Sequence, residues 1–147
     1  MRTFWLFSAI VLIAVSTACT NSTTPSSTNL AGTWTGSIQY TVTGTTGQQT
    51  ITMSLQQSGS TVTGSYSATS QGFFSNANMT VTGTVSGTFT GVLNFAPASN
   101  PNGCSGSMQV TGTGSGNTVT WTSTSFTSTC GSLTPSSVTI TATGQSS

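Results

Sequence analysis

The stretch ITMSLQQSGSTVTGSYSA, residues 51–68, decides the fold class of this chain. Ile51, Met53 and Leu55 stand at alternate positions in its first half, and Val62 and Tyr66 alternate with polar residues in its second half. Such alternation of apolar and polar residues is typical of a β-strand with one buried face. The intervening SGS is typical of a tight turn, because glycine adopts backbone conformations that other residues avoid. The stretch therefore predicts an antiparallel β-hairpin.

The same alternation runs from Leu30 to about residue 143 and divides into eight segments. Short stretches rich in glycine and serine separate many of them, such as GTTG at 44–47 and GSGN at 114–117. The main apolar positions are Trp34, Ile38, Tyr40, Val42, Ile51, Met53, Leu55, Val62, Tyr66, Met79, Val81, Val85, Phe89, Leu93, Phe95, Met108, Val110, Val119, Trp121, Val138, Ile140 and Ala142. No helical spacing of apolar residues follows the first 18 residues. We therefore expect eight half-buried antiparallel strands, joined mostly by hairpin-length turns.

Charge is almost absent from this chain of 147 residues, a length that suits one domain. Charged residues amount to 1%, whereas about a quarter of a typical globular sequence is charged. Arg2 is the only charged residue, and the sequence contains no His, Asp, Glu or Lys. This composition excludes nucleic-acid binding through phosphate neutralisation and metal sites built from His or carboxylates. A serine nucleophile would lack a base, so we expect no enzyme activity and no cofactor.

Eight consecutive antiparallel strands form either a β-sandwich or a closed barrel. Open sheets protect their edge strands with charges, proline or bulges, and this chain has no charges to use. A closed barrel has no edges, and inward glycines suit strands that coil sharply. These glycines are Gly64, Gly83, Gly91, Gly106 and Gly112. We therefore predict an all-β, eight-stranded antiparallel up-and-down barrel, with a β-sandwich as the alternative. The Thr- and Ser-rich outer face argues against a membrane-spanning barrel.

The first 18 residues are typical of an export signal peptide. Arg2 precedes an apolar run, residues 4–15, that is too short to span a bilayer. VSTAC at 15–19 resembles the lipobox of bacterial lipoproteins, although Ser16 stands where that motif most often has leucine. The resemblance implies cleavage before Cys19 and lipidation of that cysteine with palmitate-type acyl chains, which anchor a protein to a membrane. An ordinary cleaved signal is the alternative.

A polar tether, residues 19–29, follows the signal and precedes the barrel domain of residues 30–147. We expect the protein to be exported and lipid-anchored to the bacterial cell envelope. Thr20 stands at the position where aspartate, by resemblance to enterobacterial lipoproteins, implies retention in the inner membrane. The resemblance therefore favours the outer membrane.

The three cysteines are Cys19, Cys104 and Cys130. If Cys19 is lipidated, the other two remain as a pair in an oxidising compartment. A turn near Ser115 would place residue 104 opposite about residue 127. Cys130 would then lie three residues beyond the position opposite Cys104. We predict a Cys104–Cys130 disulfide at the open end of this hairpin. Two buried free thiols or a metal site are the alternatives.

LAGTW at residues 30–34 resembles the G-x-W motif that opens the first strand of lipocalins and the G-T-W motif of avidin-like barrels. LQQSGSTVTG at 55–64 is similar to the strand–turn–strand sequence pattern of small lipocalin-like domains in bacterial lipoproteins. The resemblance implies a lipocalin-like, or calycin-like, barrel with Trp34 closing one end. It implies no ligand. The arginine that packs over this tryptophan, the C-terminal helix of many lipocalins and the acidic residue of the avidin biotin site have no counterpart here.

Two non-enzymatic functions fit these observations. The first is a lipid-anchored barrel that binds a small apolar ligand among inward glycines and aromatic rings. The candidate ligand residues are Tyr40, Tyr66, Phe89, Phe95 and Trp121. Each of these rings could instead simply fill the core. The second function is that of a structural or surface-interaction envelope lipoprotein without a small-molecule ligand, which would use its Thr-covered exterior. In both cases the expected partner is the membrane, through the anchor, with no nucleic acid and no metal.

Overall fold

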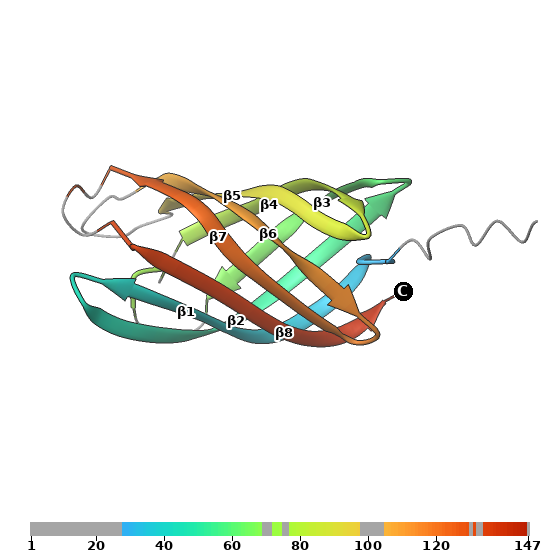
Figure 1. Ribbon diagram of the computed structural model, residues 1–147, viewed down its shortest axis with the longest axis horizontal. Helices are drawn as coiled ribbons and strands as arrows, with labels where there is room; N and C mark the ends of the chain where they lie inside the picture. The colour runs from blue at the N-terminus through green and yellow to red at the C-terminus, as the bar shows by residue number, and fades with distance from the viewer. Residues whose placement is uncertain are drawn as a thin grey trace, which may run out of the picture.

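The computed structural model describes residues 28–68, 72–74, 77–97, 105–129, 131 and 134–146. Eight antiparallel strands close into one barrel in chain order (Figure 1). They are β1 (Gly32–Val42), β2 (Thr45–Ser58), β3 (Thr61–Ala68), β4 (Ala77–Ser86), β5 (Thr88–Pro97), β6 (Gly106–Ser115), β7 (Thr118–Ser128) and β8 (Ser137–Ser146). The predicted up-and-down barrel is confirmed in place of the alternative β-sandwich, and the architecture is consistent with a lipocalin-like fold. In this described part of the chain, no helix has the length and apolar character needed to cross a membrane.

The first and last strands pair to close the barrel. β1 pairs with β2 on one side and with β8 on the other, where the register runs from Gly32 opposite Ser146 to Thr41 opposite Ser137. Each of the eight strands therefore has two hydrogen-bonded neighbours. Closure protects the strand edges in a barrel whose strands have no charged side chains to protect them.

The hairpin predicted from residues 51–68 is confirmed as part of β2 and β3. Ser58 pairs with Thr61 around the two-residue turn Gly59–Ser60. Gly59 has a φ of 59°, a left-handed conformation that glycine adopts without steric cost. The short turn fixes the register, and the register then places every apolar residue of this hairpin on one face.

The turn between β1 and β2 begins earlier than GTTG at 44–47 suggests. Val42 pairs with Thr45, so the turn consists of Thr43 and Gly44. Both turn residues have positive φ, 47° and 81°. Two left-handed residues match the twist of an antiparallel hairpin, which explains why the chain turns here rather than two residues later.

Apolar side chains fill the inside of the barrel, and hydroxyl side chains cover its outside. Trp34 and Phe89, for example, have no exposed surface. The threonines and serines between the apolar positions mostly point outward and are exposed. Neighbouring strands align these hydroxyls, as in the pairs Thr90–Thr111 and Thr111–Thr122. The barrel therefore presents an uncharged wall to its surroundings.

A β-bulge in β7 reverses the inward face of that strand. The register of β7 against β6 shifts between Gln109 and Val110, which leaves Thr124 as the extra residue. An extra residue exchanges the inward and outward sides for everything beyond it. Trp121 faces the core before the bulge, and Phe126 packs against the core after it. Without the bulge, Phe126 would face outward.

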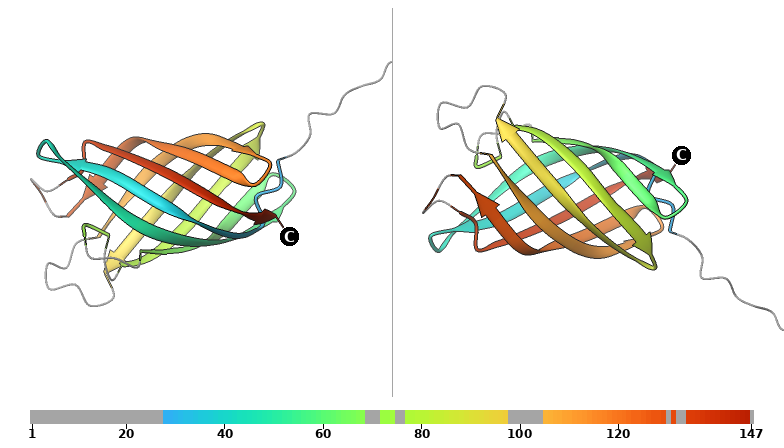
Figure 2. Two further views of the ribbon diagram at one scale, coloured as in Figure 1. Left: turned by 90° about the horizontal axis from the view of Figure 1, so that it is seen from below. Right: turned by 90° about the horizontal axis from the view of Figure 1, so that it is seen from above.

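The two ends of the barrel differ (Figures 1 and 2). At one end, here called the tight-turn end, one or two residues connect β2 to β3, β4 to β5, and β6 to β7. The start of β1 and the end of β8 lie at this same end. At the opposite end, here called the loop end, β3, β5 and β7 lead into longer connections. Any group attached through the N-terminal segment therefore joins the barrel at the tight-turn end.

Leu30 and Trp34 close the tight-turn end. The Leu30 side chain is fully buried, and its backbone N–H donates a hydrogen bond to Oε1 of Gln57 over 2.7 Å. The Trp34 indole N–H donates to the Leu30 carbonyl oxygen over 2.9 Å. The indole ring also lies over Gly144, where a Cβ atom would come within 2.9 Å of it. These contacts hold the segment before β1 across the end of the barrel.

Candidate functional site

The five predicted ligand residues fall into three separate places. Phe89 and Trp121 stack inside the barrel, with ring centroids 4.4 Å apart and planes at 22°. Tyr40 and Phe95 lie toward the loop end, near the C-terminal ends of β1 and β5. Tyr66 lies on β3, opposite Met53 and Met79 on the neighbouring strands, and its ring has no contact with the other four among the described residues. The structure therefore does not bring the five rings together around one space.

Aromatic rings occupy the space that the inward glycines leave. A Cβ atom on Gly83 would lie 2.6 Å from the Phe89 ring, and one on Gly91 would lie 2.5 Å from it. A Cβ atom on Gly112 would lie 2.8 Å from the ring of Trp121. Phe89 and Trp121 have no exposed surface. These two candidates are core residues in this structure, and the glycines provide room for their rings.

Five rings form a cluster at the loop end, here called the loop-end cluster. Its members are Tyr40, Phe73, Phe74, Phe95 and Phe126. Phe73 and Phe74 meet edge to face at 5.0 Å, and Phe95 stacks on Phe126 at 5.5 Å. Phe74 and Phe95 are buried, whereas Tyr40, Phe73 and Phe126 keep part of their surface exposed. The cluster joins two of the predicted residues, Tyr40 and Phe95, to three others.

Two hydrogen bonds fix the segment 72–74 over the loop end. The backbone N–H of Phe73 donates to the Tyr40 hydroxyl over 3.0 Å, and that of Phe74 donates to Oε1 of Gln49 over 2.8 Å. Gln49 is the one buried polar residue among those described, with 1% of its surface exposed. Its amide therefore supplies the acceptor that a buried backbone N–H needs.

The ligand residues predicted from the sequence do not include Phe73, Phe74, Phe126 or Gln49. The two phenylalanines stand in a loop, where no periodicity marks a side chain as inward. Phe126 reaches the core only because of the bulge in β7, which the sequence does not reveal. Gln49 did carry a signal, because it stands in phase with Ile51 at a position that the alternation marks as inward.

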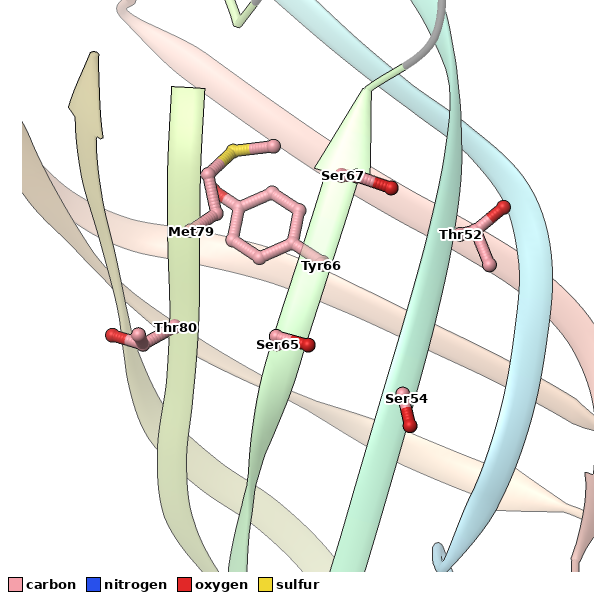
Figure 3. A pocket seen from close by; sticks show the side chains of 7 residues that line it. All are labelled: Thr52, Ser54, Ser65, Tyr66, Ser67, Met79 and Thr80. Carbon is pink, nitrogen blue, oxygen red and sulfur yellow. The ribbon is translucent and has the colours of Figure 1, made fainter. Parts of the chain in front are cut away.

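Tyr66 holds an unpaired hydroxyl in the barrel wall. Its side chain is 3% exposed, and no described residue offers its hydroxyl a hydrogen-bond partner. Burial raises the pKa of Tyr66 well above its usual value of about 10, so the phenol remains a proton donor. The ring extends from β3 toward Met79 on β4 (Figure 3). The indole N–H of Trp121 is likewise without a partner among these residues.

Cys19, Cys104 and Cys130 lie outside the described residues, as do the predicted signal and most of the predicted tether. The strands that flank the last two cysteines are described, and they correct the expected register. Gly106 pairs with Ser128, and the N–H of Thr129 donates to the carbonyl oxygen of Ser105 over 2.9 Å. Continued by one position, this ladder predicts residue 104 opposite residue 130 rather than opposite 127. The turn at Gly116–Asn117 and the bulge together account for the difference.

The chemistry available to the barrel is that of hydroxyls, amides and aromatic rings. The sequence has no His, Asp, Glu or Lys, so none of its serines has a side-chain base nearby. Within the described ranges, no three His, Cys, Asp or Glu side chains gather as a metal site would require. No known protein family, curated protein or solved structure matches the chain.

Proposed function

We propose that this chain is a non-enzymatic, lipid-anchored protein of the bacterial cell envelope that acts through contacts of its outer surface. The observation that supports this most directly is the packing of the interior, where the rings of Phe89 and Trp121 lie over the inward glycines. A barrel filled by its own side chains is a rigid support rather than a container. The surface left for interaction is the uncharged outer wall and the loop end.

The position of the N-terminal segment determines which end of the barrel would face the membrane. A lipidated Cys19 would join the barrel through a tether that reaches about 17 Å as a flexible coil. Residues 28–31 lie across the tight-turn end, where Leu30 is buried. The tight-turn end would then face the membrane, and the loop end would point away from it. Lipidation and location at the outer membrane are parts of this proposal.

The loop-end cluster favours a second candidate function, the binding of a small apolar ligand. Tyr40, Phe73 and Phe126 keep part of their ring surface accessible, and they surround the buried rings of Phe74 and Phe95. Partly exposed rings at one end of a rigid barrel offer apolar area to a ligand. This candidate places the ligand on the end of the barrel instead of inside it.

The anchor is tested by fractionating the envelope of cells that produce the full chain. We expect the protein in the membrane fraction, with acyl chains on Cys19 in the mass spectrum. The Cys19→Ser variant should leave that fraction. Without acyl chains on residue 19, the exported protein lacks the two-chain attachment to the membrane. A Cys19→Ser protein that is exported and still sediments with membranes would contradict the lipid anchor.

Contact through the outer wall is tested by photo-crosslinking in the host that makes the protein. A photoreactive residue at Thr80 or Thr120, both exposed, should yield adducts with envelope components. Native mass spectrometry of the same protein separates the two candidates. Wall adducts and an empty protein support the proposed function, whereas a copurifying apolar molecule that is lost in Phe126→Ser supports the ligand function. An empty protein with no adducts at either position would refute both.

A further inference from the structure

The outer wall has a hollow of about 470 Å³ over β2, β3 and β4 (Figure 3). Five hydroxyl side chains line it, namely Thr52, Ser54, Ser65, Ser67 and Thr80. Tyr66 and Met79 also line it, although both side chains are almost completely buried. The described pairing of β3 with β4 ends at the pair Tyr66–Met79, so this hollow lies where the two strands stop being joined.

The register sets the hydroxyls of this hollow in rows. Ser65 pairs with Ser54 on one side and with Thr80 on the other. Neighbouring strands are about 4.8 Å apart, so three hydroxyl side chains follow one another across the wall at that spacing. Each hydroxyl can both donate and accept a hydrogen bond, and none carries a charge.

The unpaired hydroxyl of Tyr66 is a second and independent feature of the same place. No described group accepts its proton, and the side chain is 3% exposed. A buried donor without a partner is unfavourable, and an acceptor that reaches it restores the lost hydrogen bond. Met79 is its neighbour on β4, and an unbranched methionine side chain adapts its shape readily. Both side chains belong to the core, so a ligand in the hollow reaches the Tyr66 hydroxyl only when Met79 moves aside.

A second hollow, of about 420 Å³, continues along the wall over β4, β5 and β6. Its lining includes Thr82, Thr84, Thr90, Val92, Gln109 and Thr111. Thr80 of the first hollow and Thr82 of the second are consecutive outward residues of β4, about 7 Å apart along the strand. The two hollows therefore adjoin and are both lined by uncharged side chains.

We propose that this wall, from β2 to β6, binds a neutral oligosaccharide chain. The inference rests on the proposed function, since it names the partner of the outer surface. Sugar hydroxyls both donate and accept hydrogen bonds, as the serine and threonine side chains in the two hollows do. An ionic polymer would find no countercharge, because the mature barrel has no charged side chain. Two adjoining hollows suit a chain of sugars, and a sugar oxygen over Met79 would accept the proton of Tyr66.

The test uses the full, lipidated chain in a polyoxyethylene detergent, which has no sugar head group to compete. Methionine labelled with ¹³C in its methyl group reports on Met79 in the first hollow, and on Met53 and Met108 inside the core. The probes are cellohexaose, maltohexaose and chitohexaose, with a hexamer of galacturonate as the charged counterpart. We expect at least one neutral hexasaccharide to shift the Met79 signal to saturation, with smaller changes at the other two signals.

Matched variants make the result specific. Tyr66→Phe and Ser65→Ala should each weaken binding about fivefold, the loss typical of one hydrogen bond. Thr120→Val, on the outer face of β7 and outside both hollows, should bind as the unaltered protein does. An unchanged Met108 signal in Tyr66→Phe would show that the fold is intact, because Met108 lies on β6, away from Tyr66, whereas Met53 is paired with Tyr66. Equal affinities of Tyr66→Phe, Ser65→Ala and the unaltered protein would overturn the proposed site.

Other outcomes separate this inference from the proposed function. If no neutral hexasaccharide shifts Met79 while Thr80 or Thr120 still forms envelope adducts, the wall has a different partner and the oligosaccharide proposal is wrong. If the galacturonate hexamer binds as tightly as the neutral probes, selection for a neutral chain is refuted. If neither binding nor adducts are found, the proposed function fails together with the inference.

Discussion

At the scale of single residues, the core is built by placing a large ring over a glycine. Phe89 lies over Gly83 and Gly91, which are themselves paired across β4 and β5. A ring that covers a glycine shields its exposed backbone and fills the space that the missing side chain leaves. The alternation of the sequence shows that these positions face inward, but it does not show which ring covers which glycine. That assignment depends on the register, which is a property of the closed sheet.

Gly91→Ala should therefore destabilise the barrel strongly. Its Cβ atom would lie 2.5 Å from the Phe89 ring and 2.7 Å from the backbone oxygen of Thr82. Overpacking of this kind costs about 1–3 kcal/mol, measurable as a lower free energy of unfolding in urea. Thr90→Ala, at the exposed neighbouring position, should cost less than about 0.5 kcal/mol. Phe89→Leu should recover part of the loss in a double variant, and a Gly91→Ala protein of unaltered stability would contradict the packing described.

Gln49→Leu should loosen the loop end. The substitution keeps the buried volume similar but removes the acceptor of the Phe74 N–H, which costs about 1–3 kcal/mol. Hydrogen exchange at the Phe74 amide should accelerate accordingly. Gln48→Leu is the matched control, because Gln48 is exposed on the opposite face of the same strand. Equal stability of the two variants, with Phe74 still protected, would show that Gln49 does not hold this segment.

At the scale of elements, strands could be predicted well and their irregularities could not. The period-two pattern predicted all eight strands, because side-chain alternation follows directly from strand geometry. The bulge at Thr124 left no mark in the sequence, since TSTSF contains no apolar residue between Trp121 and Phe126 that could reveal a change of face. Phe126 therefore entered the loop-end cluster unforeseen. Phe73 and Phe74 were missed for a related reason, because loops lack a repeat that reports direction.

The corrected register of β6 and β7 sharpens the prediction of a Cys104–Cys130 disulfide. With Gly106 opposite Ser128, the next paired positions lead directly to the two cysteines. In the chain-entropy account, a bond that closes a loop of about 27 residues stabilises the fold by about 3.5 kcal/mol. Proteolysis of the unreduced protein should yield the peptide that contains Cys104 still linked by a disulfide to the peptide that contains Cys130.

Single and double variants provide the control for this bond. Cys104→Ser, Cys130→Ser and the double variant should lose similar amounts of stability, because each removes the same cross-link. Losses that add up in the double variant, together with separate peptides from the unreduced protein, would indicate two independent thiols.

At the scale of the whole molecule, the near absence of charge determines how stability responds to its surroundings. Arg2 is the only charged residue of the chain and lies outside the barrel, so salt has little to screen. Few groups titrate between about pH 4 and pH 9, which predicts a flat stability profile over that range. Tyr66 sets the upper limit of the pH range over which stability stays constant. Its buried phenol keeps its proton to a higher pH than the phenol of the unfolded chain.

Stability should therefore fall as the pH rises above about 10. The folded-state pKa of Tyr66 is raised, so its proton stabilises the fold below the unfolded value of about 10 and this contribution is lost at higher pH. Urea unfolding at pH 7, 9, 10.5 and 11.5 would measure the decline. The decline should be much smaller in Tyr66→Phe, which has no phenol to titrate at this position. Identical alkaline profiles of the two proteins would show that Tyr66 is not responsible.

The pairing of β1 with β8 also governs the order of events during folding. These strands come from the two ends of the domain, so their contacts have the largest sequence separation in the barrel. Folding rates fall as contacts become less local. The chain loses conformational entropy when distant segments are brought together, before their contacts stabilise it. β1 gains its second neighbour only when the ten residues of β8 are available to pair with it. Until then, both β1 and β7 have an unpaired edge, so the chain is most prone to aggregate just before the barrel closes.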